Sequence, residues 1–284
     1  MERTQRTNRP TNGNRNRNRN RRRNRKNTKS APVIVVIVLI LLVLLIAVGT
    51  KIIQKYIPSK EHQNMTEYYH LQADDDISLV VDHEVLEIPG KYIDGEVYVD
   101  YETVHDRFND RFYWDANENV LLYTLPDNLV TVAAGSNTYQ VGKENQSADY
   151  TIVRNDSNTM YLALDFVEQY TNITHEVYED PNRTVINTVW GDVDTAPAKK
   201  ATQLRLKGGI KSPIVKDLEK GEPLTILEAG DSWTKVMTED GVIGYLKNKF
   251  VGKVTTETLN NDFTEPEFTH ISKDFTIEMA WHQV

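Results

Sequence analysis

The sequence predicts a membrane-anchored chain that is mostly β, with one apolar helix followed by a small α+β domain and a small β-barrel. Three observations support this fold class. Residues 33–48 are all apolar, residues 76–190 alternate apolar and polar positions between Gly, Pro and Asp turn signals, and residues 202–253 repeat short strands between glycine turns.

The apolar run is long enough to cross a bilayer. With its uncharged flanks it covers residues 31–50, which as a helix at about 1.5 Å per residue spans roughly 30 Å. A buried strand is the alternative, but strands usually run about 4–8 residues. Val and Ile form helices poorly in water, whereas in lipid only a helix pairs every backbone amide. We therefore expect a transmembrane helix.

The flanks of this helix predict its direction. Residues 1–30 carry ten Arg and two Lys against one Glu, whereas the whole chain has a net charge of −8. The positive-inside rule places the basic tail in the cytoplasm and the later domains outside, which predicts a single-pass cell-membrane protein with extracellular C-terminal domains. A cleavable signal peptide is the alternative, although its apolar region usually runs about 7–15 residues.

The basic tail, residues 1–30, has no apolar residue clusters and is expected to be disordered. Nucleic-acid binding is one interpretation of an Arg-rich segment. Because the tail adjoins a membrane helix, we expect anionic lipid as its partner and no nucleic acid. Residues 51–75 are polar and mixed in charge, and they predict a stalk. The chain contains no cysteine, which excludes disulfides, thiol catalysis and cysteine metal sites.

Residues 76–190 contain a weak internal repeat of strand, short helix, strand and strand. The first unit begins at Tyr98 and the second at Tyr161, and a hairpin around Gly135 and Ser136 separates them. This pattern resembles the copper amine oxidase N-terminal domain. The name implies copper, but copper sites need clustered imidazoles. We expect no metal and no cofactor, since the seven histidines are scattered at positions 62, 70, 83, 105, 175, 270 and 282.

Residues 191–201 predict a linker, and residues 202–253 predict a small barrel with strands at 224–227, 234–237 and 242–246. This segment resembles a bacterial SH3 domain in Arg205, in the Gly-Asp-Ser-Trp stretch that ends at Trp233, and in the Asp240-Gly241 turn. The family often has Trp where Tyr245 stands. The resemblance implies binding of cell-wall peptides or polysaccharide, for which Trp233 and Tyr245 are the candidate ligand-binding residues. The alternative is that Trp233 fills the barrel interior.

Residues 254–274 predict a second linker, and residues 275–284 a lone strand. That strand resembles the opening strand of the TIM barrel of glycoside hydrolase family 18, which would make this chain the N-terminal part of a chitinase-like enzyme. The family's Asp-x-x-Asp-x-Asp-x-Glu signature, whose Glu is the general acid, is absent from these 284 residues, so no catalytic residue is assigned.

Two classes of function follow. In the first, the chain is the non-catalytic targeting or spacer region of a hydrolase of cell-wall or chitin-like polysaccharide. In the second, it is a non-enzymatic surface protein that binds the wall or a protein partner through its SH3 domain. The coding sequence downstream of residue 284 distinguishes them.

Overall fold

A computed structural model describes residues 31–156 and 158–266, and these divide into two compact units between Tyr56 and Ile57. Each unit is considered separately. The expectations for the basic tail, residues 1–30, and for the lone strand, residues 275–284, lie outside the described residues.

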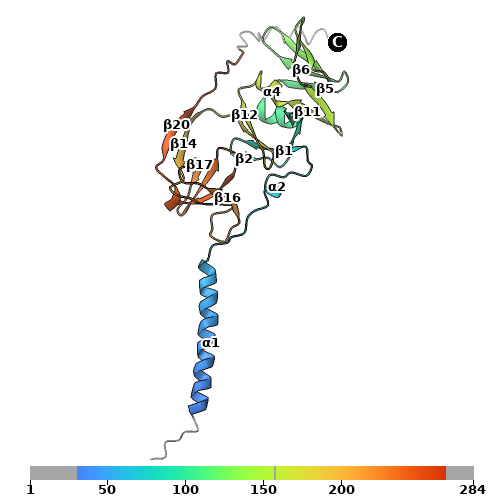
Figure 1. Cartoon of the computed structure of the whole chain (residues 1–284). Helices are drawn as coiled ribbons and strands as arrows, with labels where there is room; N and C mark the ends of the chain where they lie inside the picture. Colours follow the sequence, from blue (N-terminus) through green and yellow to red (C-terminus); the bar gives the residue numbers. More distant parts are fainter. Residues whose placement is uncertain (1–30, 157, 267–284) are drawn as a thin grey trace, which may run out of the picture. The chain divides into compact units, whose positions relative to one another are not determined.

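The described part of the first unit is one helix, α1, Ala31–Tyr56 (Figure 1). Its segment Val33–Tyr56 is long and apolar enough to cross a membrane, and none of its most apolar stretch is buried. An apolar helix with exposed side chains suits a lipid environment. The helix continues six residues beyond the predicted end at residue 50, through residues 51–56 of the predicted stalk.

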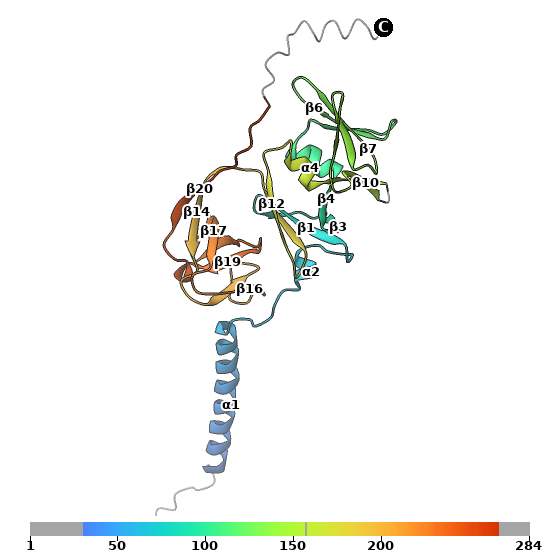
Figure 2. The ribbon, with the colours of Figure 1, turned by 45° about the horizontal axis from the view of Figure 1, so that its top comes forward.

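The second unit contains three β-sheets and a few short helices, as expected for a mostly β chain with an α+β part (Figures 1 and 2). The helical elements are α2 (Met65–Tyr68), α3 (Tyr101–Thr103), the π-helix η1 (Val104–Phe108), α4 (Leu164–Glu168) and the 3-10 helix η2 (Asn248–Phe250).

The eight-stranded sheet holds the ends of the expected α+β domain together. Its order is β10 (Val153–Asp156), β11 (Thr159–Ala163), β4 (Glu96–Asp100), β3 (Gly90–Ile93), β1 (Asp76–Val81), β13 (Arg183–Asn187) and β12 (Thr174–Tyr178), with β2 (Glu84–Val85) also pairing with β1. β1 and β13 are parallel, from Ser78 opposite Arg183 to Val81 opposite Ile186.

The internal repeat is present in the structure. β4, α3, β5 and β6 form the first unit, and β11, α4, β12 and β13 form the second. β4 and β11 pair with each other in antiparallel fashion, whereas the strands that follow them enter different sheets.

The five-stranded sheet is an up-and-down meander of β5 (Phe112–Asp115), β6 (Val120–Thr124), β7 (Leu129–Ala133), β8 (Thr138–Val141) and β9 (Glu144–Ser147). The predicted hairpin joins β7 to β8. Gly135 lies in its turn with φ +75°, a conformation that glycine adopts without a steric cost.

The seven-stranded sheet is open and contains the strands predicted for the barrel, and we keep the name barrel for this region. Its order is β16 (Ile214–Leu218), β15 (Thr202–Arg205), β19 (Ile243–Lys247), β18 (Trp233–Thr238), β17 (Pro223–Ala229), β14 (Gly191–Pro197) and β20 (Thr255–Leu259). Strands β17, β18 and β19 match the three strands expected from sequence to within a few residues.

Each predicted linker contains a strand of this sheet, and residues 267–274 of the second linker lie outside the described residues. Residues 191–197 form β14, which pairs with β17, and residues 255–259 form β20, which pairs with β14 over five residues. Thr256 and Thr258 of β20 hydrogen-bond to Asp194 and Asp192 of β14. The polar residues that suggested linkers therefore pair with one another across two strands.

The predicted stalk is corrected as well. Residues 57–71 lie against the barrel: the Gln63 amide donates to the Ile214 carbonyl at 2.7 Å, and the Ile214 amide donates to the Glu61 carbonyl at 2.8 Å. The Tyr68 hydroxyl donates to the Ile243 carbonyl at 2.8 Å, and Tyr69 is fully buried. A segment with these contacts is part of the fold, not a free spacer.

Two hydrophobic cores meet at β1 and β13. Ile77, Leu79 and Val81 of β1 join the core that also holds the five-stranded sheet, whereas Val80, the intervening residue, joins the core of the barrel. On β13, Ile186 joins the first of these cores and Val185 joins the core of the barrel. Because side chains alternate along a strand, this pair of strands is buried on both faces and joins the two domains.

Candidate functional site

A groove on the barrel is the candidate binding site, and we call it the barrel groove. Its volume is about 540 Å³. It combines aromatic, aliphatic and basic side chains, and its lining residues are Pro58, Ala201, Thr202, Gln203, Arg205, Ile210, Asp217, Leu218, Trp233, Lys247, Lys249 and Phe250.

Trp233 lies in this groove because of its place on β18. Val236 is fully buried in the core and points to the barrel interior, so Trp233, at an odd spacing from it, points to the other side. The indole is half-buried and lines the groove. The interpretation that Trp233 fills the barrel interior is therefore wrong, and that interior is occupied by Leu204, Val236 and Leu246.

A glycine lets the chain approach the indole closely. A β-carbon built on Gly208 would lie 3.3 Å from both Cβ and Cγ of Trp233. That spacing is tighter than ordinary van der Waals contact, so a larger residue at this position would displace the ring. Gly208 therefore helps to fix the position of the Trp233 indole in the groove.

Tyr245, the other residue predicted for ligand binding, is not among the groove's lining residues. It is half-buried on β19, opposite Lys235 of β18 and Arg205 of β15. Its strand position places it on the same side as Lys247, two residues further along. Tyr245 therefore lies on the same face of the sheet as Trp233, but only Trp233 lines the groove.

Basic side chains lie over the aromatic rings of the groove. The Lys247 ammonium is 6.0 Å from the Trp233 ring centre. The Phe250 ring has the ammonium groups of Lys200 and Lys249 at 4.7 Å and 4.9 Å. Sequence analysis missed Lys247, Lys249 and Phe250, although the Lys-Asn-Lys-Phe stretch at 247–250 was a visible basic and aromatic signal.

Arg205 forms a fixed part of the groove wall. It is buried, and its guanidinium donates to the Ser212 carbonyl at 2.6 Å, the Ser59 carbonyl at 3.1 Å and the Gln203 side-chain oxygen at 2.9 Å. Burial lowers the pKa of Arg205, and a guanidinium stays protonated regardless. The contact to Ser59 means that the segment before the first domain helps to build this site.

The copper implied by the domain resemblance does not fit the residues present. Among the described residues, one group has metal-ligand types close together, namely Asp165, Glu168 and His175, whose ligand atoms lie within 4.8 Å of one another. His175 Nδ1 is 2.7 Å from Glu168, and Nε2 is 3.5 Å from Asp165. A single imidazole already shared between two carboxylates lacks the histidine cluster of a protein copper site.

Two protein families match parts of the chain. The family model of the bacterial SH3 domain matches residues 200–252, and that of the copper amine oxidase N-terminal domain matches residues 80–187. No curated protein and no solved structure shows significant similarity to the chain. The chain therefore carries an amine oxidase N-terminal-like domain and a bacterial SH3 domain after one apolar N-terminal helix.

Proposed function

We propose that this chain is a membrane-anchored, non-catalytic module that binds cell-wall peptide or polysaccharide through the barrel groove. The observation that carries the proposal is the groove itself, in which Trp233 and Phe250 lie beside Lys247 and Lys249. The match to a bacterial SH3 domain over the same residues supports a binding role.

The chemistry of the groove suits a polymer of the wall. Aromatic rings offer apolar surface to aliphatic side chains and to sugar rings, and they bind with little loss of conformational entropy. The lysines attract carboxylate groups, which gives the groove a preference for ligands with free acids. Arg205 and Gly208 hold the wall of the groove in place before a ligand arrives, which reduces the entropic cost of binding.

Sedimentation with purified wall tests this proposal. The full chain in neutral detergent should sediment with wall fragments, and Trp233→Ala should weaken that binding at least about fivefold because it removes the main apolar surface. Tyr113→Ala is the matched control, since Tyr113 is an exposed aromatic residue of the five-stranded sheet. Equal binding by wild type and Trp233→Ala would exclude the groove as the site.

The orientation of the chain belongs to the same proposal. The basic tail is placed inside, on anionic lipid, and the domains after α1 are placed outside, at the wall. Protease added to intact cells should then remove the domains and spare a tag at the N-terminus. Loss of the tag under these conditions would contradict the proposed orientation.

We also propose a link between this chain and a polysaccharide hydrolase. It rests only on residues 275–284, which resemble the first barrel strand of glycoside hydrolase family 18. A reading frame that continues beyond residue 284 into Asp-x-x-Asp-x-Asp-x-Glu would support that link. A non-enzymatic surface protein that binds the wall or a protein partner is the second candidate. The barrel groove serves both, since neither requires catalysis by the residues described.

A further inference from the structure

A second cleft lies where the barrel faces the eight-stranded sheet, and we call it the sheet cleft. Its volume is about 510 Å³. One wall is formed by β12 and β13, through Glu176, Val185 and Asn187, and the other by β14, β17 and β20. The sheet cleft shares no lining residue with the barrel groove.

Strand registers show that the second wall is one continuous face. Thr195 of β14 lies opposite Thr225 of β17 and Thr255 of β20, so the three threonines form a row across the sheet. Val193 and Glu257 are opposite each other and lie on the same side, because they are two residues away from this row. This face is thus polar in the centre, with apolar and acidic positions beside it.

The charge of the sheet cleft has one sign. Glu176, Glu239 and Glu257 line it, and none of its described lining residues is lysine or arginine. All three carboxylates are exposed. Two of them contact hydroxyls: Tyr178 donates to Glu176 at 2.5 Å, and Thr195 Oγ1 donates to Glu257 at 3.1 Å. These hydroxyl partners leave the negative charge uncompensated.

Of the cations nearby, Arg183 and His83 do not neutralise this charge, and Lys235 lines the adjoining hollow with His83 and Val193 instead of the sheet cleft. Arg183 lies on the same face of β13 as Val185, but its guanidinium is buried and is occupied by Asp240 and by the carbonyls of Glu179 and Pro181. Burial lowers the pKa of His83, so that its imidazole adds no charge at neutral pH. The sheet cleft therefore offers carboxylates to a ligand that brings its own cations.

We propose that the sheet cleft binds an extended cationic peptide, with lysine-like side chains paired to Glu176 and Glu257. An extended chain suits a space between two sheet faces. The alkyl part of a lysine side chain packs on apolar positions such as Val193, while its ammonium reaches a carboxylate. The row of threonine hydroxyls adds hydrogen-bond partners for the peptide backbone. This site goes beyond the proposed function, whose groove carries the opposite charge.

The test measures binding of a labelled, acetylated peptide with alternating lysine and threonine to the full chain in neutral detergent. Its affinity should fall with rising salt, because exposed charge pairs are screened. A Glu176→Gln, Glu257→Gln double variant should bind at least about fivefold more weakly. The control is Glu118→Gln with Glu144→Gln, which changes the net charge equally on the five-stranded sheet and should leave the affinity within about twofold.

Three results would overturn the proposal. The first is no binding of the lysine peptide by the wild-type chain. The second is an equal loss of affinity in both double variants, which would indicate attraction by the net negative charge of the protein and not by the sheet cleft. The third is equal binding of a peptide with glutamate in place of lysine. Trp233→Ala should leave lysine-peptide binding unchanged, which separates this test from that of the barrel groove. Unchanged unfolding midpoints of the double variants confirm that their folds are intact.

Discussion

Glu96 shows how the fold sets the charge of a single residue. Its Oε1 atom is buried and has no hydrogen-bond partner among the described residues. Burial raises the pKa of Glu96 to about 7, and the charge of Asp165 adds to this effect, while a hydrogen bond from the Asp165 backbone opposes it. Folding therefore favours the protonated form of Glu96 relative to the unfolded chain. In the folded state, Glu96 lies near Asp165, which belongs to the cluster with Glu168 and His175.

We predict that Glu96→Gln stabilises the protein at pH 8 and leaves its stability at pH 5 nearly unchanged. Because folding raises the pKa of Glu96, its carboxyl contributes its full stabilisation of the folded state only below 4.5, the pKa of the unfolded chain. That stabilisation is lost as the pH rises through about 7. Gln stays neutral, so the loss disappears. Allowing for solvent screening, we expect a gain of about 1–2 kcal/mol at pH 8. Urea unfolding at both pH values measures it, with the exposed Glu102→Gln as control; parallel profiles for all three proteins would contradict the prediction.

The histidines support a second prediction at this scale: the described domains bind no copper tightly. In the one cluster of ligand-type residues within the described ranges, a single imidazole is shared between Glu168 and Asp165. Titration with Cu²⁺ followed by calorimetry should show weak binding that His175→Ala does not change. A stoichiometric, tight isotherm would refute it.

Strands β14 and β20 lie in segments that the sequence predicts to be linkers. Gly, Asp and Pro are depleted in strands, and residues 191–197 are rich in them. The apolar side chains of β14 are Val193, Ala196 and Pro197, and of these Ala196 is buried. What makes the segment a strand is its position between β17 and β20, including the hydrogen bonds from Thr256 and Thr258 to its aspartates.

Removal of β20 should therefore destabilise the barrel. We predict that truncation after residue 253 lowers the free energy of unfolding by about 1–3 kcal/mol, as five cross-strand pairs are lost. Truncation after residue 260 keeps β20 and is the control. Chemical denaturation of both proteins makes the comparison. If residues 254–260 were a free linker, the two truncations would have equal stability.

Local signals explain what was predictable in the fold and the site. Hairpins and turns depend on neighbouring residues, so the turn at Gly135 and the barrel strands around the Asp240-Gly241 turn followed from the sequence. The parallel pairing of β1 with β13 depends on segments about a hundred residues apart and gave no local signal. The sequence named Trp233 and Tyr245 as candidates, but whether Trp233 fills the interior or lines the groove depends on strand alternation across the sheet, and Tyr245, on the same face, is not among the lining residues.

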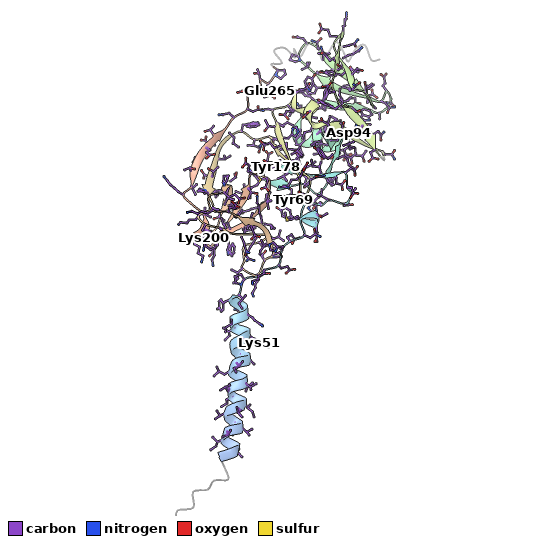
Figure 3. The ribbon with its side chains drawn as sticks, in the orientation of Figure 1. Lys51, Tyr69, Asp94, Tyr178, Lys200 and Glu265 are labelled. Atoms are coloured by element: carbon purple, nitrogen blue, oxygen red, sulfur yellow. The ribbon has the colours of Figure 1, made fainter. Side chains whose placement is uncertain are left out.

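At the scale of the whole second unit, the two matched domains share structure instead of being joined by a linker. β1 and β13 belong to the first domain, yet Val80 and Val185 are part of the barrel core. Tyr69, from the segment before both domains, is buried in the same core. Figure 3 labels Tyr69 and Tyr178, whose rings both lie near the Arg183 guanidinium, at 5.5 Å and 5.4 Å.

A charged network fixes this junction. Asp240, in the turn between β18 and β19, accepts from Arg183 at 2.7 Å and from Lys216 at 2.7 Å. Burial opposes the charge of Asp240, but hydrogen bonds from Lys216 and Thr238 and the charge of Arg183 outweigh it and lower the pKa of Asp240. The carboxylate therefore stays ionised at neutral pH and connects β13 of one domain to β16 and the β18–β19 turn of the other.

Loss of this carboxylate should uncouple the domains. Asp240→Ala leaves the buried Arg183 without its ionic partner, and removing one member of a buried charged network is strongly destabilising. Because Asp240 is partly accessible, we expect a loss of about 2–4 kcal/mol, which Asp240→Asn should reduce by retaining an acceptor.

In the wild type, hydrogen exchange should report one cooperative opening for β6 in the five-stranded sheet and β18 in the barrel. In Asp240→Ala, β18 should open at lower denaturant than β6. The exposed Asp217→Ala, which loses only a contact with His62, should behave as wild type. If β6 and β18 already open independently in the wild type, the shared core does not couple the domains, and the junction is only a contact between two separate folding units.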